Sequence, residues 1–308
     1  MGSGQQIGQG IDRLVVAPAA RRDAILQLLR SARQTIILSM FRCDDLSILD
    51  EVAAAVQRGV NVRILITQRA RGWKKKLKEL TLLLKSLGAD VRPYPSTVMK
   101  YHAKYIVADD GPALITSLNF TRKCFESTRD FLVFTEDPEV VTGLKMLFEH
   151  DCNSPAAVLT GITERLIVAP DHARARLTER LRAARNSIGI LDHRATDPRI
   201  LELLREKQSQ SVSVRVIGDV RIDGLVAHGR IILIDRTTAI IGSMHLSPPS
   251  LDARREVALV VDEAPLVTGL CDYFEALACN EANILNLWAT APPPPDVDEE
   301  DEEDEEDE

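Results

Sequence analysis

Two stretches of similar sequence decide the fold: YHAKYIVADDGPALITSLNFT at residues 101–121 and AHGRIILIDRTTAIIGSMHLS at residues 227–247. In each, a histidine (His102 or His228) precedes a cation by two positions and an aspartate by seven. A serine stands eight positions after that aspartate, and another polar residue stands two positions after the serine. One such pattern would be a weak signal. Two copies at identical spacing indicate a shared origin and a shared function.

The two stretches belong to a longer internal duplication. RLVVAP at 13–18 recurs as RLIVAP at 165–170, and each copy is followed by a helical pattern, an apolar run, a second helical pattern and another apolar run. Short β-branched runs alternating with segments of period 3.6 predict strands alternating with helices. We therefore expect an α/β fold with helices on both faces of each sheet, in repeats at 11–152 and 165–282.

The first repeat carries an insertion at 68–94 that the second lacks. Its pattern predicts an extra helix over roughly 72–87, with a strand after it. Further helices are predicted at the ends of the repeats, at 138–151 and about 264–281.

Each motif is predicted to be a strand, a turn and a second strand. Alternation along a strand places His102 and Lys104 on one face, and the second copy repeats this arrangement. Asp109 and Asp235 fall at the turns, so we expect them to have structural roles.

Two histidines backed by cations suit phosphodiester chemistry. One imidazole can attack phosphorus, and the other can protonate the departing oxygen. The cations can offset the charge that grows on the phosphoryl oxygens in between.

The two segments resemble the paired HKD motifs of the phospholipase D superfamily, and the chain is similar to bacterial cardiolipin-synthase-like and phospholipase D-like proteins. The resemblance implies two tandem α/β/α sandwich repeats, each a mixed sheet, with an active cleft at their pseudo-twofold interface. It also implies an acid after each serine, and Asp130 and Glu256 stand at those places. Which acid serves which histidine is left open. The resemblance implies no metal and no cofactor.

On this resemblance, His102 is the expected nucleophile and His228 the general acid. The other candidate catalytic residues are Lys104, Ser117, Asn119, Arg230, Ser243 and His245. The pattern departs from the family in four places, where Arg230 replaces Lys, His245 replaces Asn, Thr116 replaces Gly and Asp130 replaces Glu. The competence of the second motif therefore stays an open question.

A basic segment at the start of the insertion is the candidate substrate-binding region. Its residues are Arg69, Arg71, Trp73, Lys74, Lys75, Lys76 and Lys78. The simplest interpretation is a solvated helix face. The functional one is a rim that grips a phospholipid surface or a nucleic-acid backbone, with Trp73 as an interfacial anchor or stacking surface. Lys100, Tyr101, Arg122 and Lys123 would extend that rim.

The acidic balance of the chain comes from its end. The net charge is −8, but twelve of the last 13 residues are acidic. Without them, 34 acidic residues stand against 38 Lys and Arg, which gives a charge of about +4. We predict that the Pro-rich and acidic tail at 283–308 is disordered. It acts either as a solubilising tail or as a screen that competes with anionic ligands.

The remaining composition is that of a globular protein. Hydrophobic residues make up 45% of the 308 residues, and the longest apolar run is too short to span a membrane. The five cysteines show no metal-binding spacing, which favours reduced thiols and a cytoplasmic protein, peripheral at the membrane if it acts on lipid. We expect a monomer that cleaves or exchanges phosphodiesters, with phospholipid as the leading substrate. A nuclease and a catalytically impaired binding protein are the alternatives.

Overall fold

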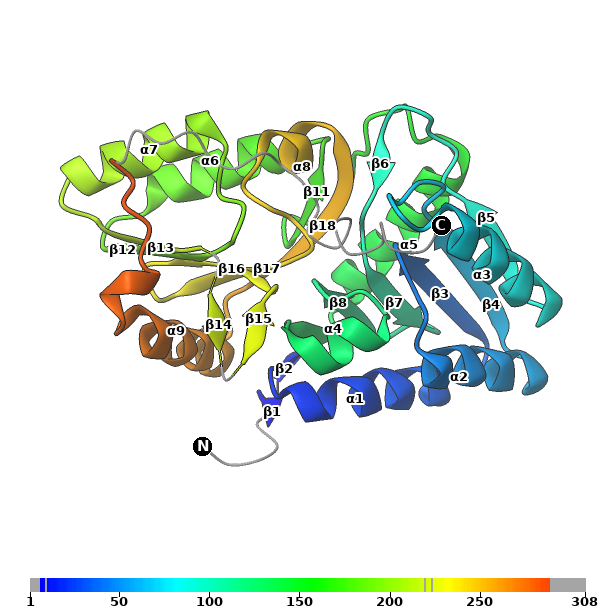
Figure 1. Ribbon diagram of the computed structural model, residues 1–308. Helices are drawn as coiled ribbons and strands as arrows, with labels where there is room; N and C mark the ends of the chain where they lie inside the picture. Colours follow the sequence, from blue (N-terminus) through cyan, green and yellow to red (C-terminus); the bar gives the residue numbers. More distant parts are fainter. Residues whose placement is uncertain (1–5, 9, 219, 223, 289–308) are drawn as a thin grey trace.

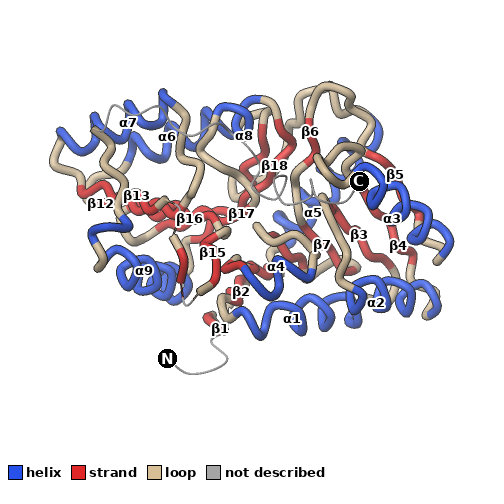
Figure 2. Tube along the Cα trace, viewed as in Figure 1, coloured by secondary structure: helices blue, strands red, loops and turns tan. Residues whose placement is uncertain are grey.

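A computed structural model describes residues 6–8, 10–218, 220–222 and 224–288 of the chain. The copies of the repeat form two mixed sheets with helices on both faces of each, as Figures 1 and 2 show. The fold class predicted from the sequence is confirmed.

The first sheet has the strand order β1-β2-β10-β8-β7-β3-β4-β5. Only the β3–β4 and β4–β5 pairs are parallel among its paired neighbours. The strands are β1 (Gln6–Ile7), β2 (Asp12–Val15), β3 (Thr35–Met40), β4 (Asn61–Ile66), β5 (Asp90–Pro93), β7 (Tyr105–Ala108), β8 (Ala113–Thr116) and β10 (Leu132–Thr135).

The second sheet repeats this topology in the order β11-β18-β17-β16-β12-β13. Its strands are β11 (Leu166–Ala169), β12 (Ser187–Leu191), β13 (Ser213–Ile217), β16 (Arg230–Ile234), β17 (Thr238–Gly242) and β18 (Arg254–Val261). Four short strands lie outside these two strand orders: β6 (Lys100–Tyr101), β9 (Thr128–Arg129), β14 (Arg221–Ile222) and β15 (Leu225–Ala227). Strand β6 pairs with β18, and β15 pairs with both β9 and β14.

The helices follow the duplication as well. They are α1 (Pro18–Ser31), α2 (Leu46–Gln57), α3 (Lys74–Ser86), α4 (Arg122–Ser127), α5 (Pro138–Asn153), α6 (Ala173–Ala183), α7 (Pro198–Ser209), α8 (Pro248–Asp252) and α9 (Ala264–Ala278). Local chemistry sets their starts. At α7, for example, the Asp197 carboxylate accepts from the amide of Ile200 at 3.0 Å, and Pro198 takes the first helical position.

Three buried apolar clusters hold the layers together. One lies between the first sheet and α1, α2, α3 and α4, and another between the second sheet and α6, α7 and α8. The third joins both sheets with α5 and α9, so the halves share a core. Alternate residues of β3 serve two clusters: Ile36 and Leu38 face one, and Ile37 faces the other.

Two expectations about individual segments are settled here. The inserted helix and strand are confirmed as α3 and β5. The predicted disordered tail is wrong for residues 283–288, because Ile284 bridges to Ile217 and the buried Leu287 packs in the outer cluster of the second half. The rest of the predicted tail, 289–308, lies outside the described residues.

Candidate active site

Strands exchanged between the halves place the two motifs. The first-half strand β6 pairs in parallel with the start of β18, and the first-half strand β9 pairs in parallel with β15. The amide of His102, directly after β6, donates to the carbonyl of Arg255 at 2.9 Å. The amide of His228, directly after β15, donates to the carbonyl of Arg129 at 3.1 Å. Each histidine thus emerges beside the residue that precedes the acid of the other half.

His102 is paired with Glu256 across the interface. Its Nδ1 lies 3.0 Å from a Glu256 carboxylate oxygen, and the Ser250 hydroxyl donates to the other oxygen at 2.8 Å. Burial lowers the pKa of His102 well below its ordinary value, and Lys104 and Arg230 add to this effect. Burial also raises the pKa of Glu256, against the opposing effect of Lys104. The pair therefore favours a neutral imidazole.

His228 is paired with Asp130 in the reciprocal way. Its Nδ1 lies 2.7 Å from Asp130 Oδ1, which also accepts from the Ser117 hydroxyl at 2.7 Å. The other Asp130 oxygen accepts from Thr128 and lies 3.5 Å from the buried guanidinium of Arg21. Burial alone would raise the pKa of Asp130, but His228, Arg21 and these hydrogen bonds hold it below its usual range. This carboxylate stays charged beside its histidine.

The two motif cations are both buried. Lys104 is fully buried, and its ammonium donates to the carbonyl of His102 at 2.9 Å. The guanidinium of Arg230 reaches three groups: Nε2 of His228 at 3.3 Å, the ring of His245, and the carbonyl of Ser117 at 3.5 Å. Arg230 therefore bridges the second motif to the first.

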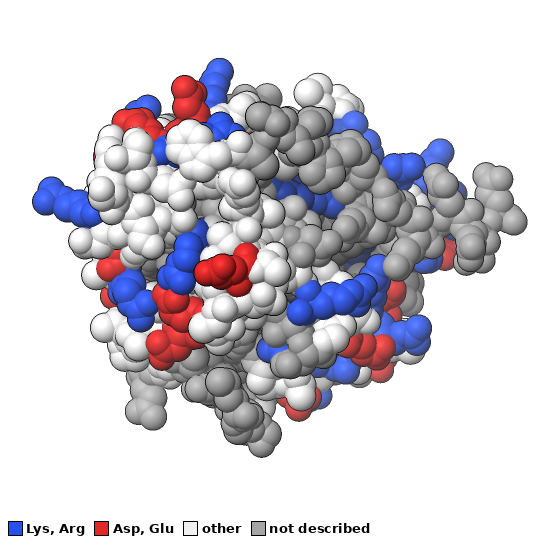
Figure 3. Space-filling model, turned by 60° about the vertical axis from the view of Figure 1, so that its left-hand side comes forward, with Lys and Arg blue, Asp and Glu red and all other residues white. Residues whose placement is uncertain are grey.

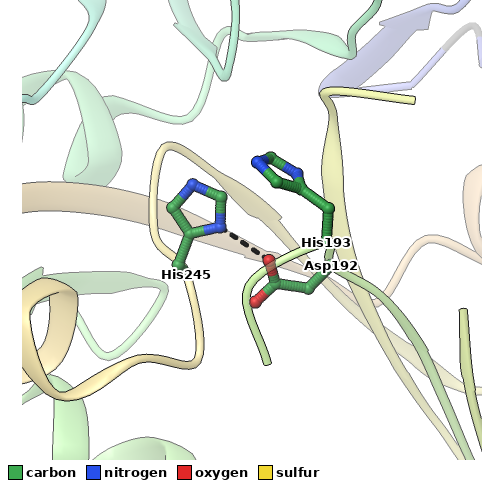
Figure 4. Close-up of side chains that lie close together, drawn as sticks. All are labelled: Asp192, His193 and His245. Carbon is green, nitrogen blue, oxygen red and sulfur yellow. Dashed lines mark hydrogen bonds and ion pairs between the residues drawn. The ribbon is translucent and has the colours of Figure 1, made fainter. Parts of the chain in front are cut away.

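The polar residues after the serines occupy buried positions. Asn119 is 1% exposed and His245 is 2% exposed. His245 Nδ1 lies 2.6 Å from Asp192 Oδ1, as the close-up in Figure 4 shows. The two serines differ. Ser117 donates to the acid Asp130 at 2.7 Å, whereas Ser243 accepts from the Val257 amide at 3.2 Å and also hydrogen-bonds to the acid Glu256.

The motif aspartates have the predicted structural role. Asp109 and Asp235 stand at the turns with φ of 51° and 53°. The Asp109 carboxylate accepts from the amides of residues 33, 34 and 35, each at 2.8 Å. Asp235 does the same for residues 185, 186 and 187. Each turn is thereby tied to the start of the neighbouring antiparallel strand, β3 or β12.

Local packing accommodates one departure from the family pattern, Thr116, and requires a glycine inside the second motif. Thr116 uses its hydroxyl to donate to the Phe131 carbonyl and to accept from the Leu118 amide, both at 3.0 Å. Gly229, between His228 and Arg230, has no space for a side chain, because an added Cβ would lie 2.4 Å from the ring of Phe131.

The basic segment differs from its prediction in one respect. Its cations are exposed, but Trp73 is only 6% exposed and packs in the core beneath α3. The ring can therefore be neither an interfacial anchor nor a stacking surface, because its face is covered. Tyr101, predicted in the rim, is likewise buried, with its hydroxyl 2.7 Å from Ser39.

A chain of contacts links the basic segment to His102. The guanidinium of Arg42 lies over the rings of Trp73, at 5.3 Å, and Phe41, at 5.0 Å, and donates to the carbonyl of Arg71 at 3.1 Å. The Phe41 ring meets the His102 ring edge-on at 4.8 Å. The segment that carries the exposed cations is thus connected to the first motif through Arg42 and Phe41.

Charges on other surfaces are mixed. On the face drawn in Figure 3, basic and acidic side chains are interspersed. Among the second-half pairs, Glu275 binds both Arg215 and Arg236.

The sequence analysis missed three polar residues of the site: Asp192, His193 and Ser250. Comparing the repeats could have revealed the first two, since Asp192 and His193 stand where the first repeat has Met40 and Phe41. No comparable signal marked Ser250, which reaches Glu256 from helix α8.

Asp192, His193 and His245 are also close enough to offer three ligand atoms to a cation. However, His245 already contacts Asp192 through Nδ1 and Arg230 through Nε2. Both of its ring nitrogens are engaged, and a guanidinium lies beside it. The cluster is therefore better described as a hydrogen-bonded network than as a metal centre.

Comparisons with known proteins concern the family and the fold. Residues 25–152 match the family described as "Cardiolipin synthase, PLD-like domain". A mitochondrial cardiolipin hydrolase of Danio rerio is 25% identical over 124 residues, which are 40% of this chain and 53% of that protein. The match thus spans about half the length of that relative.

Two solved structures share the fold over most of the chain. A polyphosphate kinase from Porphyromonas gingivalis superposes on 92% of it with a TM-score of 0.73 and 20% identity, which covers 51% of the kinase. A phosphatidylserine synthase from Haemophilus influenzae superposes on 91% with a TM-score of 0.66 and 12% identity, which covers 89% of the synthase. In the part of the chain that the structure describes, no helix is both long and apolar enough to cross a bilayer.

Proposed function

Because the chain is a member of the phospholipase D superfamily, we propose that it cleaves or exchanges phosphodiester bonds through a covalent phosphohistidine on His102. The observation that carries this proposal is the reciprocal pairing of His102 with Glu256 and of His228 with Asp130. A carboxylate on Nδ1 keeps the proton there and leaves Nε2 as the reactive nitrogen.

The reaction would proceed in two displacements. In the first, the Nε2 lone pair of His102 forms a bond to phosphorus while the ester P–O bond breaks, and protonated His228 gives its proton to the departing oxygen. In the second, His228 takes a proton from water or an alcohol, whose oxygen attacks phosphorus as the P–N bond breaks. His102 is released neutral, and His228 is protonated again.

The environments of the two pairs support this division of roles. The burial that lowers the pKa of His102 keeps a lone pair available for attack. Asp130, whose pKa is held low, can stabilise a protonated His228. The pKa of Glu256 is raised and that of Asp130 is lowered, and environments that separate two acids in this way suit separate nucleophile and general-acid roles.

Access to the two Nε2 atoms also favours His102 as the nucleophile. Among the described residues, none donates to its Nε2, whereas Nε2 of His228 lies 3.3 Å from the guanidinium of Arg230. Lys104, Arg230 and Asn119 would hold the non-bridging phosphoryl oxygens. Since one chain supplies both motifs, a monomer would suffice.

Phospholipid is the substrate class we propose. The matching family is described as a cardiolipin synthase domain, and the curated relative is named as a cardiolipin hydrolase. Exposed cations such as Lys74, Lys75 and Lys78 would attract an anionic lipid surface, at which the protein would be peripheral.

Incubation with phospholipid vesicles, followed by mass spectrometry of the protein, tests the proposal. In wild type, rapid quenching should trap a phosphatidyl adduct on His102. In His228→Asn both displacements lose their proton-transfer group, so the adduct should form slowly and, once formed, persist longer than in wild type. His102→Asn should form no adduct and release no head group. His172→Asn, at a histidine outside the site, is the matched control and should behave as wild type.

The same variants distinguish the alternatives. Metal-independent nicking of DNA or RNA that is lost in His102→Asn, without lipid turnover, would identify a nuclease instead. Binding of anionic vesicles or nucleic acid that is equal in wild type and His102→Asn, with neither substrate turned over, would indicate a binding protein that has lost its chemistry.

A further inference from the structure

A third histidine–carboxylate pair lies in the site, although the two-displacement reaction uses only two. His245 and Asp192 are 2% and 3% exposed, and Nδ1 of the histidine lies 2.6 Å from the carboxylate (Figure 4). The first repeat has Asn119 and Met40 at these positions, so the pair belongs to the second half alone.

The surrounding hydrogen bonds assign the protons of this pair. Asp192 also accepts from the amides of Arg194, at 2.9 Å, and Leu246, at 2.7 Å. Nε of Arg230 also lies 3.3 Å from Nδ1 of His245, but the much shorter 2.6 Å contact with the Asp192 carboxylate places the proton of His245 on Nδ1. Burial, and then the charge of Arg230, lower the pKa of His245 well below its ordinary value. The ring is therefore neutral, with a lone pair on Nε2.

That lone pair faces the guanidinium of Arg230. The Nη2 group of Arg230 donates to Nε2 of His245 and lies 3.3 Å from Nε2 of His228, while Nη1 lies 3.5 Å from the carbonyl of Ser117. An arginine side chain has several rotatable bonds, and these contacts restrict it to one place, beside the expected general acid.

We propose that Asp192 and His245 are positioning residues, which hold the guanidinium of Arg230 where it binds the phosphoryl group next to His228. The pair provides, through a fixed tautomer, the rigid support that a long side chain needs in order to act as a preorganised donor. This role rests on the proposed function for its consequence, but it can be measured without turnover.

The His245 tautomer is the first measurement. In wild type, long-range ¹H–¹⁵N spectra of histidine-labelled protein should show the His245 proton on Nδ1. Asp192→Asn keeps the shape of the side chain but can present an N–H group to Nδ1. We expect the proton to move to Nε2, where it would oppose the N–H of Arg230.

The second measurement is the affinity of the protein for inorganic phosphate, determined by calorimetry. Asp192→Asn and His245→Leu should weaken binding about tenfold, as expected when a charged group loses its hydrogen-bonded support. His245→Gln retains an acceptor for Arg230 and should stay within about threefold of wild type. This series remains informative if one variant folds poorly.

His193→Phe is the matched control. His193 meets the His245 ring edge-on at 4.8 Å, and Phe41 holds the equivalent place in the first half. The variant alters packing around His245 without altering its Nδ1 contact, so the tautomer should stay on Nδ1.

The positioning role is overturned if wild type carries the His245 proton on Nε2 or binds no phosphate. It is equally overturned if Asp192→Asn and His245→Leu bind phosphate as tightly as wild type. A wild type with the expected tautomer and affinity that turns over no phosphodiester would instead reject the proposed function and support the positioning role.

Discussion

Nδ1 of His102, in the first half of the chain, lies 3.0 Å from the carboxylate of Glu256, in the second half. The reciprocal pair, His228 and Asp130, is separated by 2.7 Å. The strand pairs β6–β18 and β9–β15 cause this exchange, since each delivers a histidine beside the acid of the other half. Each of these two pairs therefore takes its histidine from one half and its acid from the other.

Removing the Glu256 charge should impair turnover without unfolding the protein. In Glu256→Gln, the neutral amide no longer fixes the tautomer of His102, and kcat should fall by about 10²-fold or more. Steady-state kinetics on the identified substrate measures this. Glu164→Gln, at an exposed glutamate, is the control. An unchanged kcat in Glu256→Gln would remove the acid from the mechanism.

The rate should persist into mildly acidic solution. Burial lowers the pKa of His102 well below its ordinary value, so the neutral nucleophile survives as the pH falls. The acid limb of the kcat/KM profile should therefore lie below the ordinary histidine pKa of about 6.5. A profile from pH 4 to 9 checks this, and an acid limb centred above pH 7 would contradict it.

Arg255 should matter strongly for stability. It is fully buried, with its Nε 2.9 Å from Asp151 at the end of α5, and it also binds Asp171. Arg255→Leu leaves buried carboxylates unpaired and should lower the free energy of unfolding by about 3–5 kcal/mol. Urea denaturation measures the loss.

The exposed pair of Arg236 and Glu275 offers the comparison for Arg255. Arg236→Leu should cost no more than about 1 kcal/mol, because surface ion pairs contribute little. Equal losses of unfolding free energy in the two variants would show that burial does not increase the contribution of Arg255 to stability.

His193 should make the fold sensitive to acid. Burial, with Arg230, lowers its pKa to about 3 in the folded protein, whereas an unfolded histidine titrates near 6.5. Between these pH values the unfolded chain binds a proton that the folded protein does not. The free energy of unfolding therefore falls by about 1.4 kcal/mol for each unit by which the pH is lowered. His193→Phe should remove that slope between pH 6 and pH 5. Parallel stability curves would contradict the assignment.

The acidic tail should weaken binding of anionic surfaces. Deletion of residues 296–308, which lie outside the described residues, removes twelve acidic groups from a chain whose remainder is mildly basic. Affinity for anionic vesicles should then rise at low salt and converge with wild type at high salt, where charges are screened. If sedimentation assays at low salt show an unchanged affinity for the vesicles, the screening role is rejected and the solubilising role remains.

Much of the fold could be predicted because its determinants are local. The inserted helix α3 and the strands around Asp109 and Asp235 follow from periodicity and turn residues. Trp73 was misplaced because the basic residues around it suggested a wet surface, while its ring packs under α3. Leu287 was wrongly predicted to lie in a disordered tail, because the Pro-rich sequence that follows it suggested no apolar packing.

The pairing within the site could not be predicted, because it depends on contacts between residues far apart in the chain. His102 and Glu256 are 154 positions apart, and only the exchanged strands decide which acid meets which histidine. Asp192 stood at the end of an apolar run and had no motif of its own. Its partner His245 was visible only as a departure from the family pattern.

The aspartates of the two motifs have a consequence for how such chains are recognised. Asp109 and Asp235 each tie three amides at the start of the neighbouring antiparallel strand. A descendant that had lost both motif histidines would still need these aspartates to close its turns. The final letter of the HKD signature is therefore a marker of architecture, and its presence in a distant homologue is no proof of an enzyme.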